Sequence, residues 1–118
     1  MAVLESLDGT SWKGLVEAPA AVLVLGKSDC EACKAWSDEL QRFLGSESEF
    51  AHVRFGKLLQ DQRGLIEFKR ENPWIAQLDV LPFNVIYRGG EKVGEFAGGG
   101  SERLANRLRR LVPAPPGA

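Results

Sequence analysis

The first strong pattern along the chain is an unbroken apolar run at residues 20–25, Ala-Ala-Val-Leu-Val-Leu. It ends at Gly26, and the polar residues 27–29 follow. An apolar, β-branched run that stops at a glycine is typical of a strand, and apolar side chains at successive positions indicate burial on both faces. The pattern therefore predicts a central, mostly parallel strand over residues 20–26.

A helical period follows directly. Apolar positions three and four residues apart predict a helix over residues 31–44 with one buried face, closed by Gly45 as its C-cap. These positions are Cys33, Trp36, Leu40, Phe43 and Leu44.

The rest of the chain alternates between helix and strand signals. A short helix before the central strand is predicted through Trp12, Leu15 and Val16, with Thr10 or Ser11 as its cap. Strands are predicted at residues 51–59, 80–88 and 92–96, the last two joined by a Gly-Gly hairpin at 89–90. A helix from a cap at Asp61 to the residue before Pro73, a short turn at 74–78 and a helix capped by Ser101 complete the order.

Strands separated by helices pair in parallel, whereas the hairpin adds an antiparallel pair. We therefore predict an α/β fold with a central mixed β-sheet flanked by α-helices on both faces.

Composition narrows the picture to one domain. The chain has 118 residues, is 44% hydrophobic and carries a formal net charge of −1. We assign residues 1–112 to a single domain and 113–118, Pro-Ala-Pro-Pro-Gly-Ala, to a disordered Pro-rich tail. The charge balance argues against nucleic-acid binding, and no apolar run approaches the length of a membrane span. We therefore expect no membrane or nucleic-acid partner. The N-terminus lacks the pattern of a signal peptide, so we expect a cytoplasmic chain. A monomer is the default expectation for its oligomeric state.

The only two cysteines, Cys30 and Cys33, stand at the junction of the predicted central strand and helix. There, free backbone N–H groups and the helix dipole stabilise a thiolate. Cys33 lies one turn further in, close enough to close a small disulfide ring. In a reducing compartment a lone C-x-x-C indicates a redox-active or metal-binding pair. Tetrahedral zinc needs four ligands and only His52 remains, so we expect no metal and no cofactor.

These features together resemble the thioredoxin family over roughly residues 10–112. A buried strand leads into C-x-x-C at a helix N-terminus, a strand with Lys57 follows, and Pro82 opens the next strand. The Gly-Gly hairpin, a glycine-rich turn at 98–100 and a closing helix finish the pattern. The resemblance implies a thioredoxin-like fold with a cis peptide bond between Leu81 and Pro82.

The resemblance also implies roles for particular residues. Cys30 is then the attacking thiol and Cys33 the resolving thiol, while Leu81, Pro82 and Gly98 flank an extended substrate segment. The implied activity is that of a thiol–disulfide oxidoreductase acting on disulfides of proteins or small thiols. A thioredoxin reductase or glutathione is the candidate electron donor.

The cysteines have unusual neighbours for that family. Residues 29–33 read Asp-Cys-Glu-Ala-Cys in place of Trp-Cys-Gly-Pro-Cys. Asp29, Glu31, Ala32 and Lys57 are the candidate redox-tuning residues. The acidic pair opposes ionisation of Cys30, whereas the helix dipole and nearby lysines favour it. Our hypothesis is a reducing, thioredoxin-like couple rather than a strongly oxidising one.

Two further departures leave a second function class open. Val24 stands where thioredoxins carry a buried carboxylate, and Asp38 stands where they commonly carry a proline. Lys57 or an acidic neighbour is then a candidate aid to deprotonation of Cys33. The alternative to an enzyme is a non-catalytic binding module of thioredoxin fold that docks a partner's extended segment in the groove beside Cys30.

Overall fold

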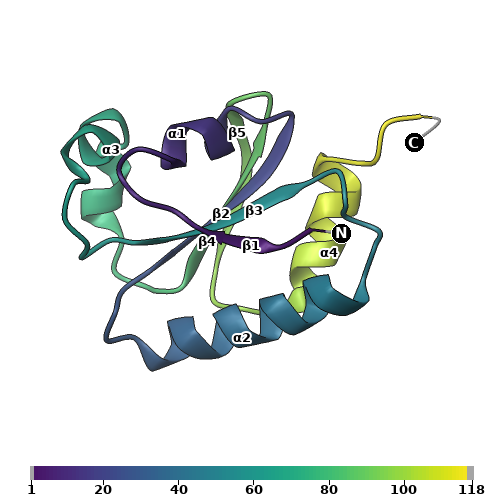
Figure 1. The fold of residues 1–118 in the computed structure, drawn as a ribbon, viewed down its shortest axis with the longest axis horizontal. Coiled ribbons are helices and arrows are strands. Elements are labelled where there is room, and N and C mark those ends of the chain that lie inside the picture. Colours follow the sequence, from purple (N-terminus) through teal and green to yellow (C-terminus); the bar gives the residue numbers. More distant parts are fainter. Residues whose placement is uncertain (1, 117–118) are drawn as a thin grey trace.

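The computed structural model describes residues 2–116 and is organised around a five-stranded sheet (Figure 1). The strands lie in the order β1-β3-β2-β4-β5. β1 and β2 run parallel to β3, while β4 is antiparallel to both β2 and β5. Their bounds are β1 Leu4–Ser6, β2 Ala20–Gly26, β3 Arg54–Leu59, β4 Phe83–Arg88 and β5 Glu91–Ala97. The prediction of a mixed sheet is confirmed.

β2 is the central strand, as its apolar run predicts. Each of its seven residues is buried. It has one parallel neighbour, β3, and one antiparallel neighbour, β4, so its pairing is more mixed than predicted. β1 was not predicted, because three residues are too few to show a strand period.

Helices cover both faces of the sheet, and Figure 1 shows α1 and α3 on one side with α2 and α4 on the other. Trp36 and Leu40 of α2 pack with Leu104 and Leu108 of α4 in one buried cluster. The opposite cluster joins residues of α1, α3 and the 3₁₀ helix η1. The bounds are α1 Trp12–Val16, α2 Glu31–Ser46, α3 Ile66–Glu71, η1 Pro73–Gln77 and α4 Ser101–Leu111.

Several predicted helix ends are wrong. α2 continues through Gly45, which does not adopt a positive φ, and ends at Ser46. Asp61 lies well before α3, whose first residue is Ile66, and it bonds to a different loop. Ser101 is the first residue of α4 rather than its cap, and its N–H donates to Glu39 Oε2 at 2.7 Å. In the last two cases a tertiary hydrogen bond replaces the local one that the sequence suggested.

The hairpin between β4 and β5 is confirmed. Gly89 and Gly90 have φ of 60° and 87°, the left-handed values that a type I′ turn needs at both central positions.

Residues 113–116 form no helix or strand, and Pro113 and Ala114 line a pocket beside the end of α4. The rest of the predicted tail, residues 117–118, lies outside the described residues. Within residues 2–116, no helix combines the length and the apolar character that a membrane span requires.

Candidate active site

The two cysteines lie at the N-terminus of α2 and form a disulfide. Cys30 is the N-cap residue, with extended φ and ψ of −103° and 108°, and its Sγ accepts a hydrogen bond from the Cys33 N–H at 3.1 Å. Cys33, one turn further along, is 5% exposed, whereas Cys30 is half-buried. The predicted strand-to-helix position of Cys30 is confirmed, and the two sulfurs differ in their access to solvent.

Gly26, the last residue of β2, allows Cys33 to lie against the end of that strand. A Cβ at position 26 would be 3.2 Å from Cys33 Cβ and 3.3 Å from its Sγ. Such contacts are tighter than most Cβ contacts in folded proteins, so a side chain at position 26 would force Cys33 to shift. From the sequence alone, Gly26 is predicted only to end a strand.

The loop between β2 and α2 is held by residues that follow β3. The Gln60 N–H donates to the Gly26 carbonyl at 2.8 Å. Asp61 accepts hydrogen bonds from the backbone N–H of Ser28, at 3.1 Å to Oδ1, and from the Ser28 hydroxyl. The Ser28 hydroxyl bond is the main cause that lowers the pKa of Asp61 below its ordinary value. These bonds fix the backbone that leads into Cys30.

The three predicted tuning residues next to the cysteines, Asp29, Glu31 and Ala32, are exposed. Glu31 pairs with Lys34, Oε1 to Nζ, at 3.6 Å. Solvent screens charges at such exposed positions strongly, so the influence of the acidic pair on the sulfurs is reduced.

Lys57 reaches the buried side of the pair. It lines a pocket of about 180 Å³ together with Cys33, Ser37, Lys27 and Lys34. No carboxylate is among the residues that line this pocket, and Val24, the cross-strand partner of Lys57, is 2% exposed. The surroundings of Cys33 are therefore basic, and basic groups beside a sulfur stabilise its thiolate.

The predicted substrate-binding residues lie at the same end of the sheet as Cys30. Leu25 of β2 pairs with Phe83 of β4, and Phe83 pairs with Ala97 of β5. Pro82 comes just before Phe83 and Gly98 just after Ala97, so the two lie side by side, and the Gly98 N–H donates to the Pro82 carbonyl at 2.8 Å. The peptide bond between Leu81 and Pro82 is cis, which confirms that prediction.

Comparison with known proteins gives a fold but no sequence relative. No family model and no curated protein matches the sequence. Among solved structures, thioredoxin f2 of Chlamydomonas reinhardtii aligns with a TM-score of 0.72 at 21% identity, over 95% of this chain and 99% of its own. Spinach chloroplast thioredoxin f, in its long form, aligns with a TM-score of 0.73 at 19% identity, over 92% of this chain and 86% of its own. Mitochondrial thioredoxin 3 of Saccharomyces cerevisiae aligns with a TM-score of 0.69 at 19% identity, over 92% of this chain and 95% of its own.

The chain has the thioredoxin fold. The resemblance deduced from the cysteines, the proline and the hairpin is confirmed at this level. The Cys30–Cys33 disulfide lies at the start of α2, at the same end of the sheet as the cis Pro82 that precedes β4.

Asn84 and Trp36 form part of the site that sequence reasoning missed. Asn84 of β4 is completely buried and is the cross-strand partner of Val24. Its Oδ1 accepts from Trp36 Nε1–H at 2.8 Å, and its Nδ2 donates to the carbonyls of Gly98 at 2.7 Å and Phe96 at 3.2 Å. The pair therefore ties α2 to the turn that carries Gly98. A polar residue inside an apolar strand was the available signal, because a buried amide needs hydrogen-bond partners.

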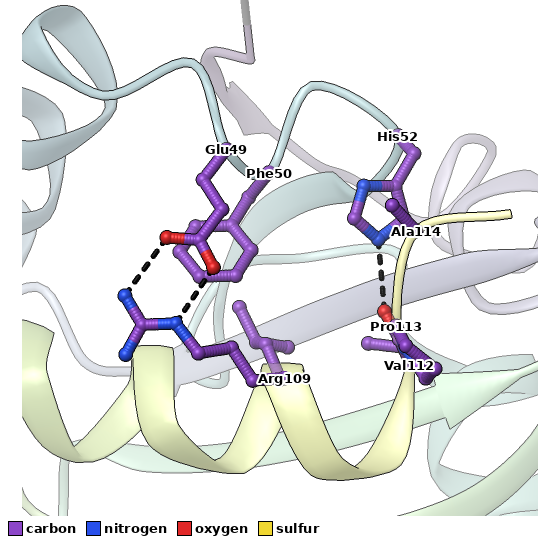
Figure 2. A pocket seen from close by; sticks show the side chains of 8 residues that line it. Glu49, Phe50, His52, Arg109, Val112, Pro113 and Ala114 are labelled. Carbon is purple, nitrogen blue, oxygen red and sulfur yellow. Dashed lines mark hydrogen bonds and ion pairs between the residues drawn. The ribbon is translucent and has the colours of Figure 1, made fainter. Parts of the chain in front are cut away.

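His52 lies away from the cysteines. It precedes β3, whose first residue pairs with Ala21, while the last residue of β3 pairs with Gly26 beside the site. Figure 2 shows its ring directed at the Val112 carbonyl, with Nε2 to O at 2.8 Å. The strand predicted over residues 51–59 therefore starts too early, because β3 begins at Arg54 and His52, in the loop before it, ties that loop to the end of α4.

Proposed function

We propose that the protein is a thiol–disulfide oxidoreductase that reduces disulfides of proteins or small thiols with the Cys30/Cys33 dithiol. The observation that carries this proposal is the pairing of an accessible Cys30 with a buried Cys33 at the N-terminus of α2, in a thioredoxin fold. The structure holds the pair as a disulfide, which is the state that follows reduction of a substrate.

The reaction begins when the Cys30 thiolate attacks one sulfur of the substrate disulfide. A bond forms between Cys30 Sγ and that sulfur, the substrate disulfide breaks, and the leaving thiolate takes a proton. The Cys33 thiolate then attacks Cys30 Sγ and releases the second substrate thiol. Two electrons pass from the dithiol to the substrate, and an external reductant must reduce the Cys30–Cys33 disulfide before the next cycle.

The parts of the site divide this work between them. Backbone N–H groups at the start of α2 stabilise negative charge on Cys30, since the Cys33 N–H already donates to its sulfur. The half-buried Lys57 favours the thiolate of Cys33. Leu81, Pro82 and Gly98 form the wall along which an extended substrate segment lies, and its backbone groups hydrogen-bond there as in strand addition.

One observation favours the alternative of a non-catalytic binding module. The pocket behind Cys33 lacks a carboxylate among its lining residues, so the resolving thiol has no acidic proton acceptor there. A module of this kind docks a partner segment in the same groove without turnover.

The two functions are separated by disulfide reduction. We expect the wild type to reduce insulin with dithiothreitol as electron source, Cys30→Ser to be inactive, and Cys33→Ser to retain a covalent mixed disulfide visible by intact-mass spectrometry. Ala35→Ser, at an exposed position of the same helix, is the matched control and should keep wild-type turnover. Absence of turnover in the wild type with both dithiothreitol and a thioredoxin reductase would contradict the enzyme and favour the binding module.

A further inference from the structure

A second cavity lies on the other side of the loop that leads to Cys30. It has a volume of about 530 Å³, against about 180 Å³ for the pocket behind Cys33. Its walls come from that loop, the end of β3, α3 and η1, and they include Lys27, Gln60, Lys69, Asn72, Ile75 and Leu78. We call it the lysine cavity. None of its lining residues is acidic.

The two lysines are available to a ligand. Lys27 and Lys69 are exposed, and neither takes part in an ion pair within residues 2–116. Asp61 is near Lys27, but its carboxylate bonds to the backbone and hydroxyl of Ser28. Two positive charges therefore face a cavity without a negative partner in its wall, which favours an anion there.

Gln60 supplies an independent signal. In the part of the chain that the structure describes, its Nε2 is buried and has no hydrogen-bond partner. An unsatisfied buried donor costs free energy, and most buried polar groups in folded proteins are paired. Gln60 lines the cavity, so a turn of its side-chain amide would bring this donor to an acceptor atom bound there.

We propose that the lysine cavity binds a carboxylate of the disulfide substrate. The Gln60 amide turns toward the cavity, so that the carboxylate accepts from its Nε2–H and lies between Lys27 and Lys69. Ile75 and Leu78 contact the aliphatic part of the same residue. This inference rests on the proposed function, because Lys27, in the wall of the cavity, belongs to the same loop as Cys30 and lies three positions before it. The substrate class is a disulfide flanked by an acidic residue, in a small peptide or in a protein.

Binding is tested without sulfur chemistry. The oxidised full-length protein, labelled with ¹⁵N, is titrated with N-acetyl-Glu-Ala-Gly amide and with its neutral counterpart N-acetyl-Gln-Ala-Gly amide. We expect the acidic peptide to shift the amide signals of Gln60, Ile75 and Ala76 and to bind about tenfold more tightly than the neutral one at low salt, with the difference falling as salt is added. Equal affinity for the two peptides overturns the proposal.

Neighbouring positions of α3 supply a matched control. Lys69→Gln and Arg70→Gln each remove one exposed positive charge, but only Lys69 lines the cavity. We expect Lys69→Gln, Lys27→Gln and Gln60→Met each to weaken binding of the acidic peptide by about fivefold, and Arg70→Gln to leave it unchanged. An equal loss for Lys69→Gln and Arg70→Gln would show that only overall charge matters.

Turnover distinguishes the sources of the carboxylate and separates this inference from the proposed function. Peptide disulfides with Glu or Gln beside the cysteine are compared by kcat/KM, and the same Glu/Gln pair is then placed beside the disulfide of a folded protein. A higher value for Glu in the peptides alone identifies small substrates, and a higher value in both extends the class to proteins. Turnover with no preference for Glu, in the peptides or in the folded protein, overturns the proposal that the lysine cavity binds a carboxylate, but not the proposed oxidoreductase function. Peptide binding by an inactive protein overturns the oxidoreductase and leaves only a carboxylate site.

Discussion

Solvent exposure is the property that distinguishes the two sulfurs of the site. Cys33 is 5% exposed and adjoins Gly26, while Cys30 is half-buried at the N-cap of α2. Because attack on a substrate disulfide needs access, this difference supports Cys30 as the attacking thiol. The acidic neighbours that make the motif unusual are exposed, as are Lys27 and Lys34, so the half-buried Lys57 is the charged residue placed to influence Cys33 most strongly.

A substitution at Lys57 tests whether positive charge near Cys33 affects the reaction. We expect Lys57→Met to slow release of the mixed disulfide about three- to tenfold at pH 7, because it removes a positive charge that favours the Cys33 thiolate. The difference should shrink as the pH rises, since the thiol then ionises without help. Stopped-flow measurement of the second half-reaction between pH 6 and 10 checks this.

Lys13→Met is the control for this test, because Lys13 is an exposed residue of α1, on the opposite face of the sheet from α2. It should leave the rate unchanged. A rate for Lys57→Met equal to the wild type at every pH would remove Lys57 from the mechanism.

At the scale of helices and strands, a polar contact between α2 and β4 organises the site. Trp36 of α2 and Asn84 of β4 are both buried, and the amide of Asn84 reaches the turn after β5. The ring of Trp36 also packs on that turn, because a Cβ at Gly99 would lie 3.0 Å from Trp36 Cε3. The turn with Gly98, one wall of the proposed groove, is therefore fixed by a network within the core.

Removing the amide should both destabilise the fold and loosen that turn. We expect Asn84→Leu to lower the free energy of unfolding by about 2 to 4 kcal/mol, because it leaves the Trp36 N–H and two carbonyls unsatisfied. Trp36→Phe, which removes one donor and keeps an aromatic ring, should cost about 1 to 2 kcal/mol. Urea unfolding gives both values.

Hydrogen exchange at residues 98–100 separates local from global effects. Faster exchange there in Asn84→Leu than overall stability explains supports the positioning of the turn by Asn84. Asn106→Leu, at an exposed position of α4, is the control and should change stability by less than about 0.5 kcal/mol. If exchange at residues 98–100 rises only as much as the loss of global stability explains, Asn84 stabilises the fold but does not specifically position the turn.

For the whole molecule, the sequence predicts those features that are carried by local patterns. The run at 20–25 predicts β2, the helical period predicts α2, and their junction places Cys30 correctly at the helix start. The hairpin follows from two adjacent glycines. β1 escapes prediction because it is short, and its pairing with β3 joins residues about fifty positions apart.

The missed parts of the site share one physical cause. The role of Gly26 depends on a helix that packs against it, and the role of Asn84 depends on a tryptophan 48 positions away in the sequence. Asp61 was predicted as a local cap but bonds to Ser28, 33 positions earlier. Long-range partners of this kind leave no periodic signal, and only the presence of a polar residue within an apolar run suggests that a partner exists.

The end of the molecule opposite the cysteines is held by a charged contact whose pH dependence can be predicted. Arg109 of α4 donates to both carboxylate oxygens of Glu49, at 2.6 and 2.8 Å, as Figure 2 shows. This hydrogen bonding holds the pKa of Glu49 below its ordinary value of 4.5. A carboxyl group with a lowered pKa stabilises the folded state above its unfolded pKa, and the contribution is lost as the pH falls through the folded value.

We therefore expect Glu49→Gln to lower Tm slightly at pH 7 and low salt, because both groups are exposed and solvent screens the pair. The difference in Tm from the wild type should shrink as the pH falls below 4.5, the ordinary pKa of the carboxyl group, and should also shrink in high salt. Scanning calorimetry from pH 3 to 7 measures both trends. Glu91→Gln is the control, since Glu91 is exposed and forms no ion pair within residues 2–116. A Tm difference for Glu49→Gln that stays constant with pH would show that shape and packing, rather than the carboxylate charge, hold Glu49 against α4.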